Sequence, residues 1–519
     1  MGEALRSRAE PAHGIAQAGV IGTGTMGQGI AQVLAQAGVE VRLHDQNPEA
    51  VARAIDSIGR ALAQQVARGR TTEADRTACL QRLRPAAALS DLANCDLVVE
   101  AIVEDLGVKR QLFTALESLL RPEAILATNT SSLSVTAVAA ACSRPERVAG
   151  WHFFNPVPLM RIAEVVRGER TADAVAQRLA QLTSAMGHHP VNAIDMPGFI
   201  VNHAGRAFIP EGLRLLSEGI AEPAEIDRVM RDVAGFRMGP FELLDLVGLD
   251  VAQQVMESLY HQYYEEPRFR ITPLVARKVA AGQLGRKCGE GFYRYVDGKI
   301  QRLDAPPAAA APRSGTLPQC VWIAPQERDL AERITARLAP VPGVRFDTGD
   351  TPPPQALAIV TPVGEDTAST CVRLGLDPAR TVAVDALFSL DKRVALMAAP
   401  GLAAPWREAA TALFEATGVA VTWLRDSPGF VAQRIVAQII NIGADMAQHR
   451  VASPADIDAA VTLALGYPKG PFGLAGQLGE ARVLHIGEAL QNAYGDPRYR
   501  PSIWLRRRAA LGQALDTPD

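Results

Sequence analysis

The sequence predicts an α/β domain at the N-terminus, an all-α domain after it, and a second half that repeats this order in degenerate form. Three observations support the prediction. Short apolar runs alternate with helical patterns up to about Pro197, which is typical of a parallel sheet covered by helices. The apolar spacing is then helical from Phe199 to about Tyr295. Motifs of this helical part recur near the C-terminus at a constant distance.

Length and composition indicate a globular chain of several domains. Its 519 residues exceed what one hydrophobic core can hold, and 48% hydrophobic with 21% charged residues is ordinary for such a chain. A net charge of −3 offers no basic surplus for phosphates, so we expect no nucleic-acid partner. No apolar stretch has the length of a membrane span, and the N-terminus lacks the apolar run of a signal peptide, so we expect no membrane association.

The cysteines indicate a reducing compartment. They are scattered along the chain, without a CxxC pair and without a Cys/His cluster of metal-ligand spacing. The six are Cys79, Cys95, Cys142, Cys288, Cys320 and Cys371. We therefore expect free thiols, a cytoplasmic protein and no metal site.

The N-terminal α/β domain is expected to begin with a strand that ends at Val20–Ile21, followed by a glycine cluster and a helix over Ile30–Ala37. A second strand is expected at Val39–His44, and a long helical stretch at Glu49–Arg68. Four more apolar runs are expected to be strands: Leu97–Val99, Ala124–Ala127, Val148–Phe153 and Ile162–Val166.

Four segments with helical spacing form the expected all-α domain: Phe199–Glu218, Ala224–Ala234, Pro240–Leu246 and Val251–Tyr260. The Pro/Ala-rich segment Asp304–Gly315 is expected to be a linker. The expected domain boundaries are a tail at 1–14, a Rossmann-like α/β domain at 15–194, a helical domain at 195–298, a linker at 299–317, a degenerate α/β region at 318–425 and a second helical domain at 426–513.

The second half contains an internal repeat at an offset of 231 residues. Asp195, Pro197, Gly198 and Phe199 recur as Asp426, Pro428, Gly429 and Phe430, and Asp227 recurs as Asp458. The run Gly239–Phe241 recurs as Gly470–Phe472, and Gly248 recurs as Gly479. One offset over this whole span indicates a duplicated helical domain. The segment Cys320–Leu424 has weaker strand and helix alternation, so we interpret it as a shrunken copy of the first α/β domain.

The glycine cluster predicts a dinucleotide site. The run Gly22, Thr23, Gly24, Thr25, Met26 and Gly27 fits G-x-G-x-x-G between a strand and a helix. Its glycines allow a tight turn, a close approach to the pyrophosphate and close packing of helix on strand. Asp45 stands about twenty residues further on, at the end of the second strand, where a carboxylate binds the ribose hydroxyls of NAD. We expect NAD rather than NADP, because Gln46 and Asn47 follow Asp45 and supply no cation for an extra phosphate.

A histidine and a glutamate are candidates for proton transfer. His152 lies at the end of the apolar run Val148–Phe153, and Glu164 lies on the next run, Ile162–Val166. Two neighbouring strands could bring the pair together. The imidazole would then act as a base toward an alcohol, while the carboxylate fixes its tautomer and stabilises the imidazolium. A lone histidine at a strand end is more often a surface or core residue, so the pairing alone leaves the role open.

From about Ile15 to Tyr295 the sequence resembles the 3-hydroxyacyl-CoA dehydrogenase family. Four runs match the family's motifs in order: Asn129–Ser132, His152–Pro156, Pro197–Asn202 and Gly239–Asp245. The resemblance implies an NAD-dependent oxidation of an L-3-hydroxyacyl-CoA to the 3-oxoacyl-CoA, in either direction. It implies that His152 is the base and Glu164 its partner.

The resemblance also implies roles for further residues. Ser131 and Asn202 would contact the reacting oxygen, and Asn155 would lie near the nicotinamide. Glu104, Lys109 and Lys287 match cofactor-contact positions of the family, although a solvated ion pair at a helix start is the alternative for Glu104 and Lys109. Arg68 falls where the family often has a basic residue for the CoA phosphates.

The repeat departs from the family at the positions that carry chemistry. Asn202 corresponds to Gln433, and matching the strand 148–154 to 382–388 places Ala386 at the position of His152 and Ala398 near that of Glu164. The region after Cys320 has no G-x-G-x-x-G. We therefore expect the second half to bind no NAD. Isolated family members dimerise through the helical domain, so the second helical domain is expected to be an internal pseudo-dimer partner, with a homo-oligomer of the whole chain left open.

The overall layout resembles bacterial dehydrogenases of phenylacetate degradation that act on 3-hydroxyadipyl-CoA. That substrate and 3-hydroxybutyryl-CoA are both open. One alternative is a dehydrogenase of a non-CoA hydroxy or sugar acid, against which the helical stretch Glu49–Arg68 argues, because it could cover the thioester. The other is a scaffold protein with residual motifs, which the intact set of glycines, Asp45, His152 and Glu164 opposes for the first half.

Overall fold

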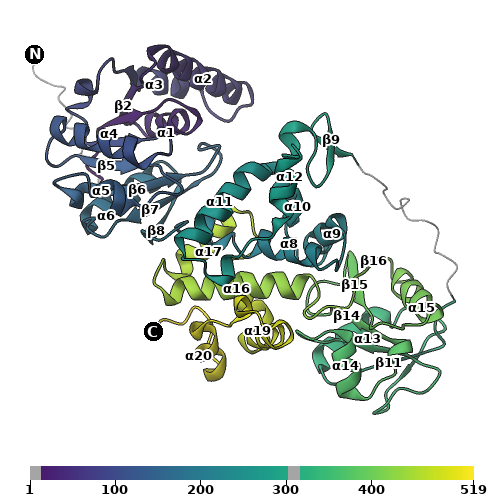
Figure 1. Ribbon diagram of the computed structural model, residues 1–519. Helices are drawn as coiled ribbons and strands as arrows, with labels where there is room; N and C mark the ends of the chain where they lie inside the picture. Colours follow the sequence, from purple (N-terminus) through teal and green to yellow (C-terminus); the bar gives the residue numbers. More distant parts are fainter. Residues whose placement is uncertain (1–12, 302–315) are drawn as a thin grey trace, which may run out of the picture. The chain divides into compact units, whose positions relative to one another are not determined.

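The computed structural model describes residues 13–301 and 316–519, which form two compact units (Figure 1). The first unit comprises the chain up to His203 together with His449–Leu465, and the second comprises Ala204–Gln448 and Gly466–Asp519. Most of the expected tail and the expected linker at Asp304–Gly315 lie outside the described residues.

The first unit is built on an eight-stranded sheet in the order β3-β2-β1-β4-β5-β6-β7-β8. All neighbouring strands are parallel except β6 and β7, which are antiparallel. The strands are β1 Gln17–Ile21, β2 Glu40–His44, β3 Leu83–Pro85, β4 Leu97–Glu100, β5 Ile125–Thr128, β6 Val148–Phe153, β7 Ile162–Arg167 and β8 His189–Ile194. The chain passes to opposite sides of β1 on its way to β2 and β4, and in such sheets this switch point is where ligands bind.

Helices cover both faces of this sheet. They are α1 Thr25–Gln36, α2 Pro48–Ala67, α3 Glu73–Arg82, α4 Leu106–Leu119, α5 Val135–Ala139 and α6 Asp173–Ala185. One core cluster joins the strands to apolar side chains of α1, α2 and α6, and a second joins the other face to α4 and α5. The predicted Rossmann-type fold is confirmed. The first helix starts five residues before Ile30, because its first turn faces the glycine loop and carries no apolar periodicity.

The second unit starts with the predicted helices. They are α8 Phe208–Ser217, α9 Pro223–Asp232, α10 Pro240–Val247, α11 Leu249–Gln262 and α12 Pro273–Ala280, preceded by the short α7 Val201–Ala204. The single helix expected over Phe199–Glu218 is therefore interrupted between α7 and α8. A hairpin that the sequence pattern did not reveal follows, with β9 Arg294–Val296 paired to β10 Lys299–Gln301.

A six-stranded sheet confirms the degenerate α/β region. Its order is β12-β11-β13-β14-β15-β16, and only β14 and β15 are antiparallel, as only β6 and β7 are in the first sheet. The strands are β11 Cys320–Ile323, β12 Arg345–Asp347, β13 Leu357–Val360, β14 Thr381–Val384, β15 Arg393–Met397 and β16 Ala420–Trp423. The helices are α13 Arg328–Leu338, α14 Thr367–Leu374 and α15 Ala404–Glu415.

The second set of helices is also present. It consists of α16 Ala432–Gln448, α17 Pro454–Ala464, α18 Pro471–Leu478, α19 Glu480–Tyr494 and α20 Ile503–Leu511. Nearly every residue of α16 is buried, and α16 packs on α8, α18, α19 and α20. Short 3₁₀ helices complete the chain: η1 Leu89–Leu92, η2 Pro145–Arg147, η3 Pro267–Phe269, η4 Arg286–Cys288, η5 Pro378–Arg380 and η6 Pro497–Tyr499.

Each helical repeat contacts the sheet of the opposite half in the same way. In the first unit α17 packs on β7 and β8, and the Ile194 N–H donates to the Val451 carbonyl at 3.0 Å. In the second unit α9 packs on β15, and the Arg425 N–H donates to the Ile220 carbonyl at 3.0 Å. Arg425 and Val451 are the positions 231 residues after Ile194 and Ile220. The repeat seen in the sequence is therefore also a repeat of contacts.

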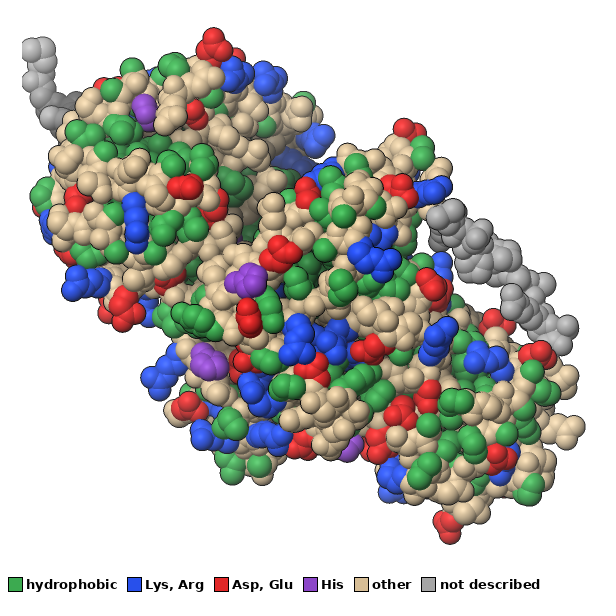
Figure 2. Space-filling view, viewed as in Figure 1, with side chains coloured by type: hydrophobic (Ala, Val, Ile, Leu, Met, Phe, Trp, Pro, Cys, Tyr) green, Lys and Arg blue, Asp and Glu red, His purple; other side chains and the backbone are tan. Residues whose placement is uncertain are grey.

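The surface and the helix lengths add two observations. Acidic and basic side chains are interspersed over the face that Figure 2 shows. Within the described ranges, every helix is too short or too polar to cross a lipid bilayer.

Candidate active site

The glycine loop lies at the carboxyl edge of the first sheet, between β1 and α1. Gly22 has a φ of +87°, and a Cβ there would lie 2.5 Å from the Ala101 carbonyl oxygen. A Cβ on Gly27 would lie 1.8 Å from the Gly22 carbonyl oxygen. Both positions therefore require glycine, as the tight turn and the close packing of helix on strand demand.

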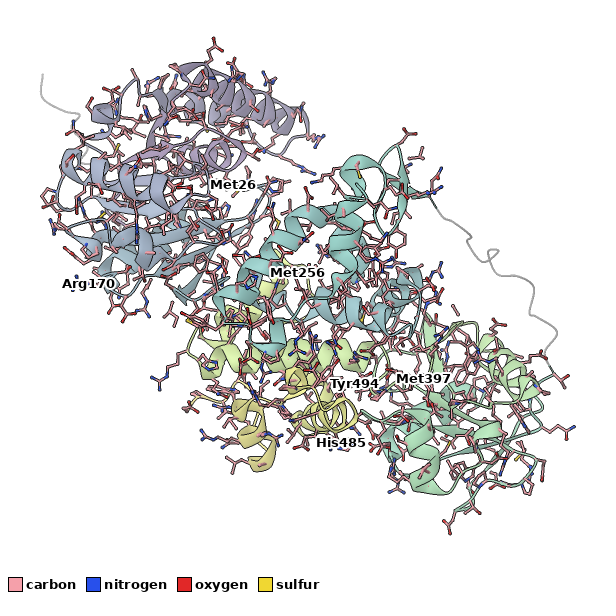
Figure 3. All side chains as sticks on the ribbon, in the orientation of Figure 1. Met26, Arg170, Met256, Met397, His485 and Tyr494 are labelled. Carbon is pink, nitrogen blue, oxygen red and sulfur yellow. The ribbon has the colours of Figure 1, made fainter. Side chains whose placement is uncertain are left out.

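The same loop leaves room for a phosphate group. A Cβ on Gly24 would meet no atom within 4 Å, and no side chain caps α1 at this residue. The first turn of α1 begins with Thr25 and Met26, and Met26 (labelled in Figure 3) packs on the sheet core. The N–H groups in the first turn of a helix lack partners within the helix, and in a Rossmann fold such groups hold a pyrophosphate. The residues present therefore fit a dinucleotide.

Asp45 follows β2 beside this loop. Its Oδ2 accepts hydrogen bonds from the Thr23 N–H at 2.8 Å and the Thr23 hydroxyl at 2.9 Å, and its Oδ1 accepts one from the Asn47 N–H at 3.0 Å. Partial burial acts to raise the pKa of Asp45, but these hydrogen bonds outweigh it and hold the pKa below its usual value. A charged carboxylate is thus fixed where ribose hydroxyls are expected.

His152 and Glu164 are direct partners across β6 and β7. The antiparallel register pairs them, and His152 Nδ1 lies 2.5 Å from Glu164 Oε2. The His152 side chain is 7% exposed and that of Glu164 is fully buried. The expectation that neighbouring strands bring the two residues together is confirmed, because the strands occupy the predicted positions.

Glu164 is also held from the other side. Its Oε1 accepts hydrogen bonds from the Ile200 and Val201 N–H groups, each at 2.9 Å. These two residues belong to the Pro197–Asn202 run that the sequence singled out. The carboxylate therefore fixes both the imidazole and the segment that carries Asn202.

Ser131 lies on a loop that Glu104 organises. Glu104 Oε1 accepts hydrogen bonds from the Thr130 hydroxyl at 2.6 Å, the Ser131 N–H at 2.9 Å and the Ser132 N–H at 3.1 Å. Asn202 Nδ2 lies 3.4 Å from the Ser131 carbonyl oxygen. The structure thus brings Ser131, Asn202 and Glu104 together at the carboxyl edge of β5.

Lys109 is buried rather than solvated. Its side chain is 1% exposed, and Nζ lies 2.5 Å from Glu100 Oε1 and 3.3 Å from Glu104 Oε2. A solvated ion pair at a helix start is therefore wrong for this lysine. Glu100 also accepts hydrogen bonds from the Thr128 hydroxyl and the Ile102 N–H, both at 2.7 Å. Sequence reasoning missed Glu100, although an acid that directly follows the apolar run Leu97–Val99 is the signal that could have revealed it.

Three candidate residues take no part in these hydrogen bonds and ion pairs. Asn155 is exposed on the loop after β6. Arg68 is exposed at the C-terminal end of α2. Lys287 belongs to the second unit, where its ammonium lies 2.6 Å from both carboxylate oxygens of Asp250.

The second half has no counterpart of the His152–Glu164 pair, as predicted. The residues that stand in its place differ from those predicted. Val384 pairs with Leu396, and the Asp385 N–H donates to the Ala395 carbonyl at 3.1 Å. Asp385 and Ala395 therefore occupy the places of His152 and Glu164, and the assignments to Ala386 and Ala398 are wrong. The reason is that the connection between β14 and β15 is two residues shorter than the one between β6 and β7, so no single offset fits both strands.

Gln433 fills the place that Asn202 has in the first half. Its Nε2 donates to Asp385 Oδ1 at 3.0 Å and to the Pro362 carbonyl at 3.1 Å, and its Oε1 accepts from the Gly364 N–H at 2.8 Å. Asp385 is fully buried, and burial raises its pKa to about 6. Asp385 Oδ1 is thus paired with Gln433, whereas Asp385 Oδ2 is buried without a hydrogen-bond partner among the described residues.

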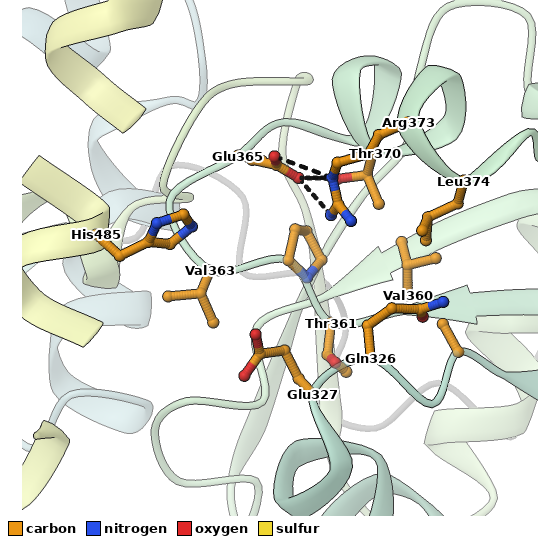
Figure 4. Close-up of a pocket in the computed structure, with 12 residues that line it drawn as sticks. Gln326, Glu327, Val360, Thr361, Val363, Glu365, Thr370, Arg373, Leu374 and His485 are labelled. Carbon is orange, nitrogen blue, oxygen red and sulfur yellow. Dashed lines mark hydrogen bonds and ion pairs between the residues drawn. The ribbon is translucent and has the colours of Figure 1, made fainter. Parts of the chain in front are cut away.

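The switch point of the second sheet, between β11 and β13, holds a pocket of about 320 Å³ (Figure 4). Ala324, Gln326 and Glu327 follow β11 and line this pocket. On the opposite wall Arg373 binds Glu365 at 2.7 Å. An acid directly before α13 disfavours a phosphate at that helix start.

Family models match most of the chain, in both halves. The model described as "3-hydroxyacyl-CoA dehydrogenase, NAD binding domain" matches residues 17–196, and "3-hydroxyacyl-CoA dehydrogenase, C-terminal domain" matches 198–295 and 429–516. The model described as "3-hydroxybutyryl-CoA dehydrogenase reduced Rossmann-fold domain" matches 373–428.

Similar proteins fall into full-length and half-length relatives. A 3-hydroxyadipyl-CoA dehydrogenase of Escherichia coli K12 is 39% identical over 96% of this chain and 98% of its own length. A probable 3-hydroxybutyryl-CoA dehydrogenase of Deinococcus radiodurans is 44% identical over 53% of this chain and 99% of its own length. A crystal structure described as 3-hydroxybutyryl-CoA dehydrogenase from Escherichia coli K12 superposes with a TM-score of 0.82 at 36% identity, covering 96% of this chain and 99% of that one.

Proposed function

This chain belongs to the 3-hydroxyacyl-CoA dehydrogenase family and is an NAD-dependent oxidoreductase of 3-hydroxyacyl-CoA thioesters, and we propose that its substrate is 3-hydroxyadipyl-CoA. The observation that supports this substrate is likeness over both halves of the chain. The alignment with the Escherichia coli relative named for that thioester covers 96% of this chain. The alignment with the Deinococcus relative named for 3-hydroxybutyryl-CoA covers 53%. Membership of the family also favours CoA thioesters over the non-CoA hydroxy or sugar acids that the sequence had left open.

We assign the proton transfer to His152. With Nδ1 bound to Glu164, Nε2 is the ring nitrogen left to take the proton of the 3-hydroxyl group. The buried Glu164 carboxylate keeps Nδ1 protonated and stabilises the imidazolium that forms. When bound, NAD supplies the acceptor for the hydride that leaves C3. In reduction, Nε2 returns the proton to the 3-oxo oxygen.

The remaining roles follow from the carboxyl edge of the first sheet. Gly22, Gly24 and Gly27 would hold the pyrophosphate and Asp45 the adenosine ribose. Ser131 and Asn202 would donate hydrogen bonds to the reacting oxygen, with Asn155 near the nicotinamide. The buried Lys109 supports this loop through Glu104, in addition to the cofactor role that the family implies. We also propose that Lys287 contacts the cofactor and that Arg68 contacts the CoA phosphates.

Steady-state kinetics on a series of thioesters tests the substrate. We expect kcat/KM with NAD to be highest for 3-hydroxyadipyl-CoA and lower for 3-hydroxybutyryl-CoA. The second substrate is the alternative, supported by the name of the crystal structure that covers both halves. A kcat/KM for 3-hydroxybutyryl-CoA equal to or above that for the dicarboxylic thioester contradicts our proposal. Reduction of free acetoacetate at the rate of acetoacetyl-CoA would contradict the need for CoA.

We further propose that the second half binds no NAD and that the helical domains at 195–298 and 426–513 form an internal pseudo-dimer. The paired contacts of Ile194 with Val451 and of Arg425 with Ile220 support it, because a two-fold interface repeats every contact in reciprocal form. A looser correspondence adds to this support: Asp456 accepts from the Asn192 N–H, and its counterpart Glu225 accepts from the hydroxyl of Thr422, the residue next to the counterpart of Asn192, at 2.7 Å.

A fragment that ends near Pro312 tests the pseudo-dimer. It should expose an apolar helical face and either self-associate or aggregate. A soluble, fully active monomer in light scattering would show that the second half does not cover this surface. Titration of the full chain with NADH should give one site per chain, and two sites would contradict the loss of binding in the second half.

We propose a cytoplasmic location. The support is that all six cysteines are free, and five of them are buried. Fractionation of cells that express the protein tests this directly. Recovery outside the cytoplasmic fraction would contradict it.

A further inference from the structure

A buried cluster of charges lies between α8 of the first helical domain and α16 of the second. The Arg434 side chain is 0% exposed, and its guanidinium binds the Glu211 carboxylate, whose side chain is 1% exposed. The guanidinium also binds both oxygens of Glu218, at 2.6 and 2.8 Å. Charges so deeply buried are costly unless each has a partner, so this cluster is sensitive to what faces it.

Two tyrosines of the second helical domain complete the cluster. The Tyr499 hydroxyl lies 2.7 Å from Arg434 Nη2 and 2.7 Å from Glu211 Oε1. The Tyr494 hydroxyl lies 2.7 Å from Arg434 Nη1 and 2.9 Å from Glu218 Oε2, and Figure 3 labels this residue on α19. Arg498 Nε lies 3.6 Å from Glu211 Oε2.

The buried ion pairs of the cluster join the two domains. Arg214 of the first domain also lies 3.9 Å from Glu218 and 3.2 Å from Asp496 of the second. The carboxylates of Glu211 and Glu218 come from the first helical domain, and the guanidiniums of Arg434 and Arg498 come from the second. The repeat does not conserve Arg434 or Glu211. At the offset of 231, Arg434 corresponds to His203 and Glu211 corresponds to Ile442.

When two helical domains pair about a two-fold axis, the offset of 231 residues indicates which residues face each other. In a pair of two first helical domains, Glu211 of each copy would face His203 of the other where Arg434 stands now, and would lose the guanidinium that binds it most closely. Arg268 would then take the place of Arg498, because the run Pro267–Arg270 recurs as Pro497–Arg500. In a pair of two second helical domains, Arg434 of each copy would face Ile442 of the other. The combination of a first with a second domain is the one that places Arg434 against Glu211.

We propose that the buried cluster centred on Glu211 and Arg434 selects the partner of the first helical domain: it admits the second helical domain of this chain and rejects another copy of the first. The inference rests on the proposal that the second half takes the place of a second subunit. Apolar packing supplies the attraction in this interface, and the cluster supplies the penalty for the wrong partner. Because the two domains are tethered in one chain, pairing within the chain is also favoured by effective concentration.

Full-length variants test the selection. We would compare Glu211→Met, Arg434→Met and the double variant by size-exclusion chromatography with light scattering over a range of concentrations, and by thermal melting. Each single variant leaves buried charge without its main partner and should melt about 5–10 °C below the wild type. The double variant removes both charges and should melt closer to the wild type than either single variant. It should also show a molar mass that rises with concentration, because domains of different chains can now pair.

The ion pair of Arg506 with Glu488 provides the matched control. It lies in the second helical domain at 2.6 Å with both side chains 39–40% exposed, so Arg506→Met with Glu488→Met should change neither mass nor melting temperature appreciably. None of these residues is in the proposed catalytic site, so kcat should remain that of the wild type in every folded variant.

A double variant that keeps the wild-type mass at every concentration overturns the proposal. If the double variant fails to fold, Glu211→Gln replaces it, because it keeps the length of the side chain and a partner for the Tyr499 hydroxyl while removing the charge. Its molar mass should also rise with concentration, and an unchanged mass counts against selection by charge. A different result would contradict the pseudo-dimer itself: a soluble, fully active monomer of the fragment that ends near Pro312.

Discussion

Replacing Glu164 by Gln tests the assigned mechanism at its most constrained point. The wild-type carboxylate accepts three hydrogen bonds, from His152 Nδ1 at 2.5 Å and from the Ile200 and Val201 N–H groups at 2.9 Å each. The glutamine oxygen can still accept from the two backbone groups. Its NH₂ group would then face His152 Nδ1 and donate to it, so the ring proton must move to Nε2.

The expected magnitude follows from that tautomer. An imidazole with its proton on Nε2 cannot take the proton of the 3-hydroxyl, and the imidazolium also loses its adjacent negative charge. We expect kcat to fall by roughly 10³-fold, which corresponds to about 4 kcal/mol of transition-state stabilisation. NADH affinity should hardly change, because the glycine loop and Asp45 lie outside this hydrogen-bond network.

Two measurements separate this effect from general damage. NADH absorbance with acetoacetyl-CoA gives kcat and KM, and quenching or enhancement of NADH fluorescence on titration gives cofactor affinity. Glu169→Gln, which changes an exposed acid on the loop after β7, is the matched control and should behave as the wild type. A Glu164→Gln enzyme that retains kcat within about threefold of the wild type would refute the reasoning, since a tautomer effect cannot be so small.

Three further outcomes are expected. His152→Ala should lower kcat by roughly 10²–10⁴-fold while NADH binding stays nearly intact, and near-normal turnover would exclude His152 as the base. Asp45→Ala should weaken NAD binding and reduce the preference for NAD over NADP, as measured by KM for each; a wild-type preference for NADPH would show that Asp45 does not discriminate. Asp385→Asn should change how stability depends on pH. Burial raises the pKa of Asp385 from 3.8 to about 6, so its contribution is fully present below about pH 4 and is lost as the pH rises through about 6. The stability of the wild type relative to this variant should therefore fall by up to about 3 kcal/mol between pH 4 and pH 7.5 in denaturant titrations, and a difference that does not vary with pH would contradict it.

The first half could be predicted well because its signals are local. A glycine that needs a φ of +87°, as Gly22 does, or that admits no Cβ, as Gly27 does, leaves a fixed imprint on the sequence. The strands β6 and β7 could likewise be recognised from their apolar runs, and placing His152 and Glu164 one strand apart was enough to predict their contact. Glu100 had one local signal, its position directly after the apolar run Leu97–Val99, but its partners Lys109 and Thr128 are 9 and 28 residues away along the chain and no local pattern indicates them.

The sequence by itself determined the family, the glycine loop, the pairing of His152 with Glu164 and the existence of the duplication, since each depends on residue types at fixed spacing. The tertiary structure decided which residue of the second half stands in the place of His152. Strand register sets that position, and a connection shortened by two residues moved it to Asp385 without a visible mark in the sequence. The tertiary structure also decided that Arg434 meets Glu211, 223 residues away. Such contacts depend on how two separately folded repeats pack against each other, and no periodicity within either repeat encodes that packing.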